Sequence, residues 1–110
     1  MNKLITMILT LGFASMASAN CGQTILNWAS ERYNRVTSTY EITLDEALAS
    51  LEKSPYVSSD EKAELAAELQ QPNTLSYNLI TDEDGGTVFT LLAVNASTCE
   101  VKASTVTYAE

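Results

Sequence analysis

Residues 74–108 constrain the fold more than any other stretch, because they read as three successive β-strands. Leu75, Tyr77 and Leu79 recur at every second position, which is the period of a strand. This run ends at residues 82–86 (Asp-Glu-Asp-Gly-Gly), where Asp-Gly and Gly-Gly readily adopt the positive φ angles of a two-residue hairpin turn. The sequence therefore predicts an antiparallel hairpin. Its expected pairs are Leu75 with Val94, Tyr77 with Leu92, and Leu79 with Thr90.

The next connection, residues 95–98 (Asn-Ala-Ser-Thr), fits a four-residue loop between the second and third of these strands. A loop of that length predicts the pairs Val94 with Cys99, Leu92 with Val101, and Thr90 with Ala103. Cys99 is then expected on the apolar face of the sheet. The opposite face carries polar residues together with an apolar group, which consists of Ile80, Phe89, Leu91, Val106 and Tyr108.

Residues 1–19 have the pattern of a secretory signal peptide, with Lys3 near the start, an apolar run and a final Ala-Ser-Ala. We expect cleavage after Ala19 and one mature domain of residues 20–110, located in the periplasm or secreted. The apolar run is too short for a membrane span, which takes about 20 apolar residues. Asn20 stands where lipoprotein signals have a small residue, which disfavours a lipid anchor on Cys21.

The chain has two cysteines, Cys21 and Cys99. In an exported domain the simplest expectation is one disulfide bond, which joins the mature N-terminus to the last strand. A redox-active thiol is disfavoured, because the sequence has no Cys-x-x-Cys pair and no histidine to activate a thiolate.

Helical signals precede the hairpin. Residues 23–33 have the apolar spacing of a helix, and residues 35–43 alternate as a strand does. The alternative is that the helix continues to about Ser38. Thr43 and Ser58 each begin a capping box, and both of the short helices that follow end where a proline disfavours α geometry. The predicted fold class is α+β: an N-terminal helix, a strand, two short capped helices and a three-stranded antiparallel meander. About four strands are expected in one sheet, with helices packed on it.

The charge balance and the missing residue types exclude several functions. All fourteen Asp and Glu but only five of the six Lys and Arg follow Ala19, so the mature net charge is 5 − 14 = −9. Such a charge balance repels nucleic acid and anionic membrane surfaces. It remains compatible with a basic partner, or with solubility alone. Histidine is absent, which removes the commonest general base and the usual metal ligand sets, and no nucleophile motif is present. We expect no catalytic residues, no metal and no cofactor.

By elimination, the expected function is binding. The leading hypothesis is a small inhibitor or immunity-type protein that occludes another exported protein. If neither capped helix covers the apolar group on the second face, that group becomes the anchor of the interface, and an acidic rim attracts a basic partner. The rim consists of Asp82, Glu83, Asp84 and Glu100. The alternative is a structural or envelope-associated module that binds a small ligand between helices and sheet, for which an enclosed apolar cavity is expected.

Overall fold

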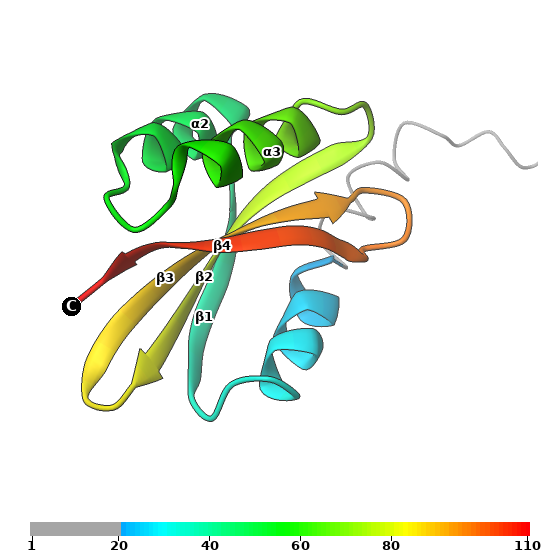
Figure 1. Cartoon of the computed structure of the whole chain (residues 1–110). Helices are drawn as coiled ribbons and strands as arrows, with labels where there is room; N and C mark the ends of the chain where they lie inside the picture. Colours follow the sequence, from blue (N-terminus) through cyan, green and yellow to red (C-terminus); the bar gives the residue numbers. More distant parts are fainter. Residues whose placement is uncertain (1–20) are drawn as a thin grey trace, which may run out of the picture.

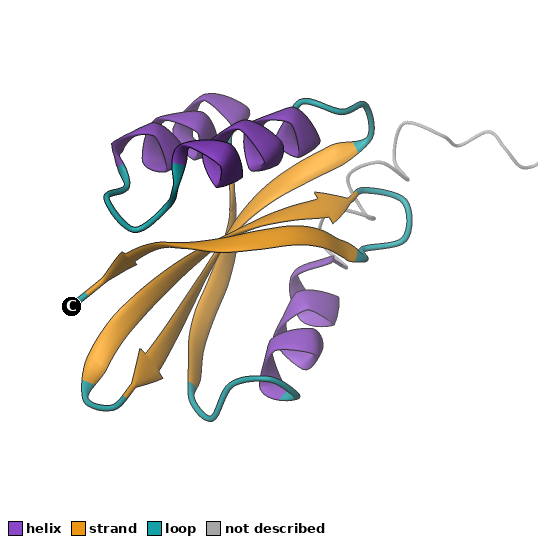
Figure 2. Cartoon of the chain, in the orientation of Figure 1, coloured by secondary structure: helices purple, strands orange, loops and turns teal. Residues whose placement is uncertain are grey.

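The computed structural model describes residues 21–110 and shows an α+β fold (Figures 1 and 2). A helix through residues 21–30 is followed by strand β1 (Val36–Ile42), helix α2 (Leu44–Lys53) and helix α3 (Ser59–Leu69). Strands β2 (Thr74–Glu83), β3 (Gly86–Asn95) and β4 (Val101–Ala109) complete the described chain. The four strands form one antiparallel sheet in the order β1-β2-β3-β4, which confirms the predicted fold class. The expected signal peptide lies outside the described residues.

The β2–β3 hairpin has the predicted turn and register. Asp84 and Gly85 form the turn with φ angles of 50° and 84°, and Glu83 pairs with Gly86. Both angles lie in the left-handed region, which glycine adopts without a steric penalty and aspartate tolerates. The predicted pairs are confirmed: Leu75 with Val94, Tyr77 with Leu92, and Leu79 with Thr90.

The β3–β4 connection differs from the predicted four-residue loop because Asn95 organises a longer turn. Its side-chain oxygen accepts hydrogen bonds from the backbone N–H groups of Ser97 and Thr98, at 2.8 and 3.0 Å. Its carbonyl oxygen accepts another from Cys99, which has a left-handed φ of 64°. Strand β4 therefore begins only at Val101.

The predicted register of β3 and β4 is consequently wrong. The observed pairs are Val94 with Val101, Leu92 with Ser104, Thr90 with Val106, and Phe89 with Tyr108. Two one-residue irregularities interrupt the pairing, and each exchanges the two faces of β4. The first moves Val106 to the face opposite Phe89, which corrects its predicted place in the apolar group. The second returns Tyr108 to the predicted face.

Helices cover both faces of the sheet, each over a separate hydrophobic core (Figure 1). The N-terminal core combines Cys21, Ile25 and Ala29 of the first helix with Tyr77, Leu79, Leu92 and Val94 of the sheet. The α2–α3 core combines Ala47, Leu51, Val57, Leu65 and Leu69 with Leu91 and Ala93. Alternation along β3 accounts for this arrangement, because successive side chains of a strand point to opposite faces.

A disulfide bond joins Cys21 and Cys99, with 5.0 Å between their Cα atoms, which confirms the predicted pairing. It links the N-terminal helix to the β3–β4 turn across a sequence separation of 78 residues. Disulfides form and persist in oxidising compartments, so the bond fits an extracellular or periplasmic protein.

Within residues 21–110, no helix has the length and apolar character needed to cross a membrane.

Both predicted capping boxes are present. The hydroxyls of Thr43 and Ser58 accept hydrogen bonds from the N–H groups of Glu46 and Glu61, and each glutamate accepts one from the N-cap N–H in return. These contacts satisfy donors that have no partner inside the helix.

We expect Thr43→Ala and Ser58→Ala each to lower the free energy of unfolding by about 0.5–2 kcal/mol, because each removes one N-cap acceptor. Urea melts followed by circular dichroism measure the effect. Ser59→Ala is the matched control, since Ser59 lies inside α3 and its substitution leaves the capping box in place. Equal midpoints for Ser58→Ala and Ser59→Ala would show that the cap does not stabilise α3.

Candidate functional site

Helices α2 and α3 cover only part of their face of the sheet, because strands are much longer than helices of the same residue count. The ten residues of α2 span about 15 Å, whereas the ten residues of β3 span about 33 Å. Leu91 lies under the helices and is fully buried. Ile80 and Phe89, nearer the β2–β3 turn, remain partly exposed, and Tyr108 beside Phe89 is 46% exposed. The predicted apolar group is thus covered at one end only.

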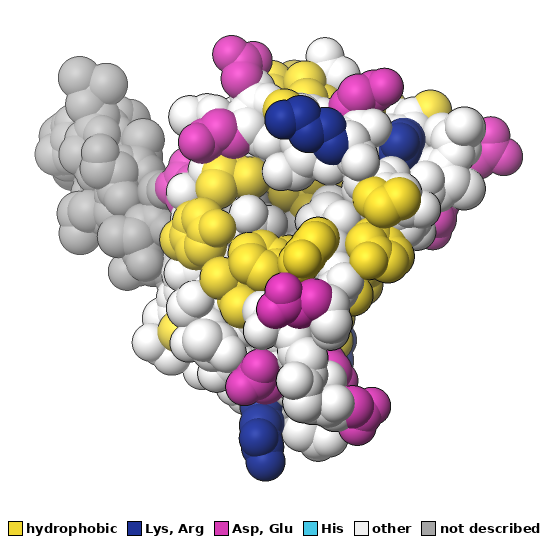
Figure 3. Space-filling model, turned by 90° about the vertical axis from the view of Figure 1, so that its left-hand side faces the viewer, with side chains coloured by type: hydrophobic (Ala, Val, Ile, Leu, Met, Phe, Trp, Pro, Cys, Tyr) yellow, Lys and Arg dark blue, Asp and Glu magenta, His cyan; other side chains and the backbone are white. Residues whose placement is uncertain are grey.

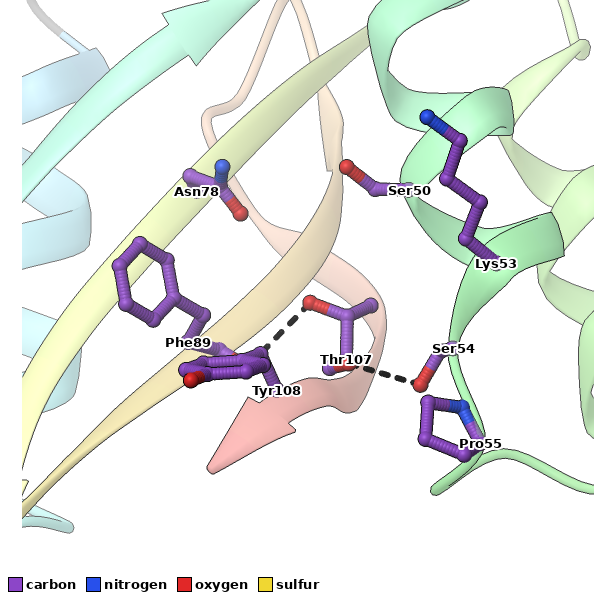
Figure 4. Close-up of a pocket in the computed structure, with 8 residues that line it drawn as sticks. All are labelled: Ser50, Lys53, Ser54, Pro55, Asn78, Phe89, Thr107 and Tyr108. Carbon is purple, nitrogen blue, oxygen red and sulfur yellow. Dashed lines mark hydrogen bonds between the residues drawn. The ribbon is translucent and has the colours of Figure 1, made fainter. Parts of the chain in front are cut away.

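A groove of about 390 Å³ lies at the uncovered end, between α2 and the sheet (Figure 4). We call it the aromatic groove. Its helix side is lined by Ser50, Lys53, Ser54 and Pro55, and its sheet side by Asn78, Phe89, Thr107 and Tyr108. In Figure 3, which faces this side of the molecule, hydrophobic side chains gather in the middle of the surface, with charged side chains around them.

Two aromatic rings form the sheet side of the groove. Phe89 and Tyr108 pack edge to face with ring centroids 5.7 Å apart and an interplanar angle of 77°. The Tyr108 hydroxyl donates a hydrogen bond to Oε2 of Glu110 at 3.3 Å. The negative charge of Glu110, together with this hydrogen bond, raises the pKa of Tyr108. The phenol therefore remains protonated and uncharged at neutral pH.

The loop between α2 and α3 is tied to β4, which fixes the width of the groove. The buried Ser54 hydroxyl donates to the carbonyl oxygen of Thr107 at 2.7 Å and accepts from the N–H of Tyr56 at 3.2 Å. The Tyr56 hydroxyl in turn donates to the carbonyl oxygen of Ala109 at 2.8 Å. Three hydrogen bonds thus position the loop that forms one wall of the groove.

Polar groups with unused hydrogen-bonding capacity also line the groove. The Asn78 amide nitrogen donates to the Tyr40 hydroxyl at 3.3 Å, but its Oδ1 is buried and has no hydrogen-bond partner among residues 21–110. A buried acceptor left without a partner costs free energy. Opposite Asn78, α2 contributes the Ser50 hydroxyl and the Lys53 ammonium, and within the described chain Lys53 makes no ion pair (Figure 4).

The residues predicted for the acidic rim do not surround this groove. Asp82, Glu83 and Asp84 gather at the β2–β3 turn, where they line a separate depression together with Arg35. Glu100 precedes β4, at the opposite end of β3 from the β2–β3 turn. Because a strand of ten residues spans about 33 Å, Glu100 lies roughly that far from the other three rim residues.

Sequence reasoning missed most of the groove. Ser50 lies in the last turn of α2, and Ser54 and Pro55 follow that helix. Asn78 lies on β2, and no spacing in the sequence connects it to them. The only signal was the alternation of β2, which places Asn78 on the same face as Ile80.

Comparisons with known proteins assign no family to this chain. No family model matches the sequence, and neither a curated protein nor a solved structure matches it.

Over residues 21–110, no group of three or more His, Cys, Asp or Glu side chains is arranged to hold a metal ion.

Proposed function

We propose that this protein is a small exported binding protein that occludes another exported protein, as an inhibitor or immunity protein does, with the aromatic groove as its anchor. The observation that carries the proposal is the Phe89–Tyr108 ring pair, which stays partly exposed beside a filled α2–α3 core. Large aromatic side chains at the edge of a preformed groove are typical anchors of protein–protein interfaces.

The neighbouring surface extends the aromatic character of the groove. Tyr56 is 53% exposed and Tyr40 is 44% exposed, and each is joined by a hydrogen bond to the sheet side of the site. Tyrosine contributes contact area at a small cost in conformational entropy. We infer that an apolar partner side chain packs against Phe89 and Tyr108.

Binding without catalysis is supported by the side chains at hand. Histidine is absent from the whole sequence, and the groove is lined by hydroxyl, amide, ammonium and aromatic groups with no carboxylate among them. These groups bind and orient a partner, but they include no general base that operates near neutral pH.

The second candidate is a module that binds a small ligand, and one observation favours it. The groove lies between α2 and the sheet, and its volume of about 390 Å³ falls within the range of small-molecule sites. Such sites bury most of the ligand, however, and a wall that includes the half-exposed Tyr108 suits a protruding partner side chain better.

We expect Tyr108→Glu to abolish capture of the partner when the immobilised protein is exposed to extract of the producing cells. The substitution puts a charge against the Phe89 ring, and a charge that loses its water on binding is costly. Because Tyr108 is exposed, the melting temperature should change little. Mass spectrometry of the retained proteins measures the outcome.

Asn27→Glu is the matched control, because Asn27 is exposed on the N-terminal helix, which covers the opposite face of the sheet. It should retain the partner. Capture that survives Tyr108→Glu would contradict the proposal. A small molecule bound to the wild-type protein in native mass spectrometry, and lost from Tyr108→Glu, would favour the second candidate.

A further inference from the structure

Strand β4 forms one edge of the sheet, and part of this edge is open. The C-terminal part is closed, since the carbonyl oxygens of Thr107 and Ala109 accept hydrogen bonds from Ser54 and Tyr56. Between the two irregularities, Ala103–Val106 pairs regularly with β3. Within the described part of the chain, no strand pairs with the outer side of this segment. An unpaired edge presents a row of backbone donors and acceptors to an added strand.

A second groove, of about 460 Å³, runs beside this open edge. Helix α3 lies above β4 and forms its other wall (Figure 1). The residues that matter here are Ala103, Ser104 and Thr105 on the strand, and Glu61, Glu64 and Glu68 on the helix. We call it the acidic groove.

The acidic groove already holds one ammonium group at its end. Lys102, at the start of β4, places Nζ 3.2 Å from Oε1 of Glu68. Glu61 uses one carboxylate oxygen in the cap of α3. Glu64, between them, makes no ion pair with any described residue, so its negative charge is uncompensated.

The spacing of the carboxylates suits an extended segment. Along α3, Glu64 lies about 4.5 Å from Glu61 and about 6 Å from Glu68 in axial rise. Side chains on one face of a strand repeat about every 6.8 Å. Lysine or arginine at alternate positions of an added strand would therefore reach successive carboxylates. A second copy of this chain is a poor occupant, because two acidic grooves would face each other.

We propose that the open edge of β4 binds an extended, basic segment of the partner protein by strand addition, with α3 carboxylates beside its Lys or Arg side chains. The inference rests on the proposed function and names the chemistry of the partner. Main-chain hydrogen bonds supply affinity in this mode, and alternate side chains supply specificity.

The probe is a capped peptide, Thr-Lys-Val-Lys-Val-Lys-Thr, titrated into the ¹⁵N-labelled protein and followed by NMR. We expect chemical-shift changes centred on residues 103–106 and on Glu64. Glu64→Gln should weaken binding about two- to fivefold, the effect of losing one exposed ion pair, and added salt should erase the difference. Glu52→Gln, an exposed carboxylate of α2 outside the groove, should leave binding unchanged.

Two further peptides test the backbone and charge separately. The first peptide is N-methylated at alternate residues, which removes the backbone donors on the edge of the peptide that would pair with β4, and we expect it not to bind. The second has Glu in place of each Lys, and we expect it not to bind either. Equal binding of the N-methylated peptide, or shifts absent from β4, would overturn the inference. Concentration-dependent shifts of β4 without peptide would also overturn it, because a second copy would then occupy the edge. These readouts do not depend on Tyr108, so they can fail while the Tyr108→Glu capture experiment succeeds.

Discussion

Reduction of the Cys21–Cys99 bond should lower the free energy of unfolding by about 2–4 kcal/mol. The bond closes a loop with a sequence separation of 78 residues, for which chain entropy alone gives about 4.5 kcal/mol. Disulfide bonds deliver less than this chain-entropy value where the cross-link strains the folded state or the reduced chain retains structure, so we expect the smaller range. Since small domains are marginally stable, the loss is a large fraction of the total.

The measurement compares urea midpoints with and without a reductant, alongside the double variant Cys21→Ser/Cys99→Ser. Thiol titration of the denatured, unreduced protein should detect no free thiol, because the two cysteines are the only ones in the chain. Two titratable thiols, or a midpoint that reductant does not move, would contradict the expectation.

Leu79→Ala and Leu91→Ala should each destabilise the protein by about 2–5 kcal/mol, the range for truncating a fully buried leucine. Both side chains are completely buried, but they lie in different cores: Leu79 under the N-terminal helix and Leu91 under α2 and α3. Comparable losses would show that helices pack on both faces of the sheet.

Denaturant unfolding followed by circular dichroism and tryptophan fluorescence checks both variants. Val106→Ala serves as the control, since Val106 is an exposed aliphatic residue of the same sheet and should change stability by much less. A loss below about 1 kcal/mol for Leu91→Ala would mean that α2 and α3 do not pack on the sheet as described.

The elements predicted correctly from the sequence depend on local chemistry. The Asp84-Gly85 turn follows from residues that adopt positive φ, and the helix starts at Thr43 and Ser58 follow from hydroxyl and carboxylate groups three positions apart. In each case a few neighbouring residues determine the conformation.

The β3–β4 register could not be predicted in the same way. It depends on how the Asn95 side chain closes the turn and on two irregularities in the pairing of β4. Each irregularity exchanges the two faces of β4. Val106 follows one irregularity and lies on the face opposite to the predicted one, whereas Tyr108 follows both and lies on the predicted face.

The site was predictable only in part. Phe89 and Tyr108 were expected on one face, and they form the aromatic pair. Whether the face would be covered depends on where α2 crosses the sheet, which is a tertiary property. The groove also needs Ser54 and Tyr56 to tie the α2–α3 loop to β4, and hydrogen bonds between residues 53 positions apart leave no sequence signature.

Site-specific photo-crosslinking in the producing cells tests the proposed binding groove most directly. A benzophenone amino acid replaces Tyr108 in one variant and Asn27 in the other, so that two exposed positions report on opposite faces of the sheet. The predicted result is a crosslink from position 108 to one defined exported protein, with no such crosslink from position 27. Equal crosslinking from both positions, or none from position 108 while the partner is still captured, would contradict the aromatic groove as the anchor.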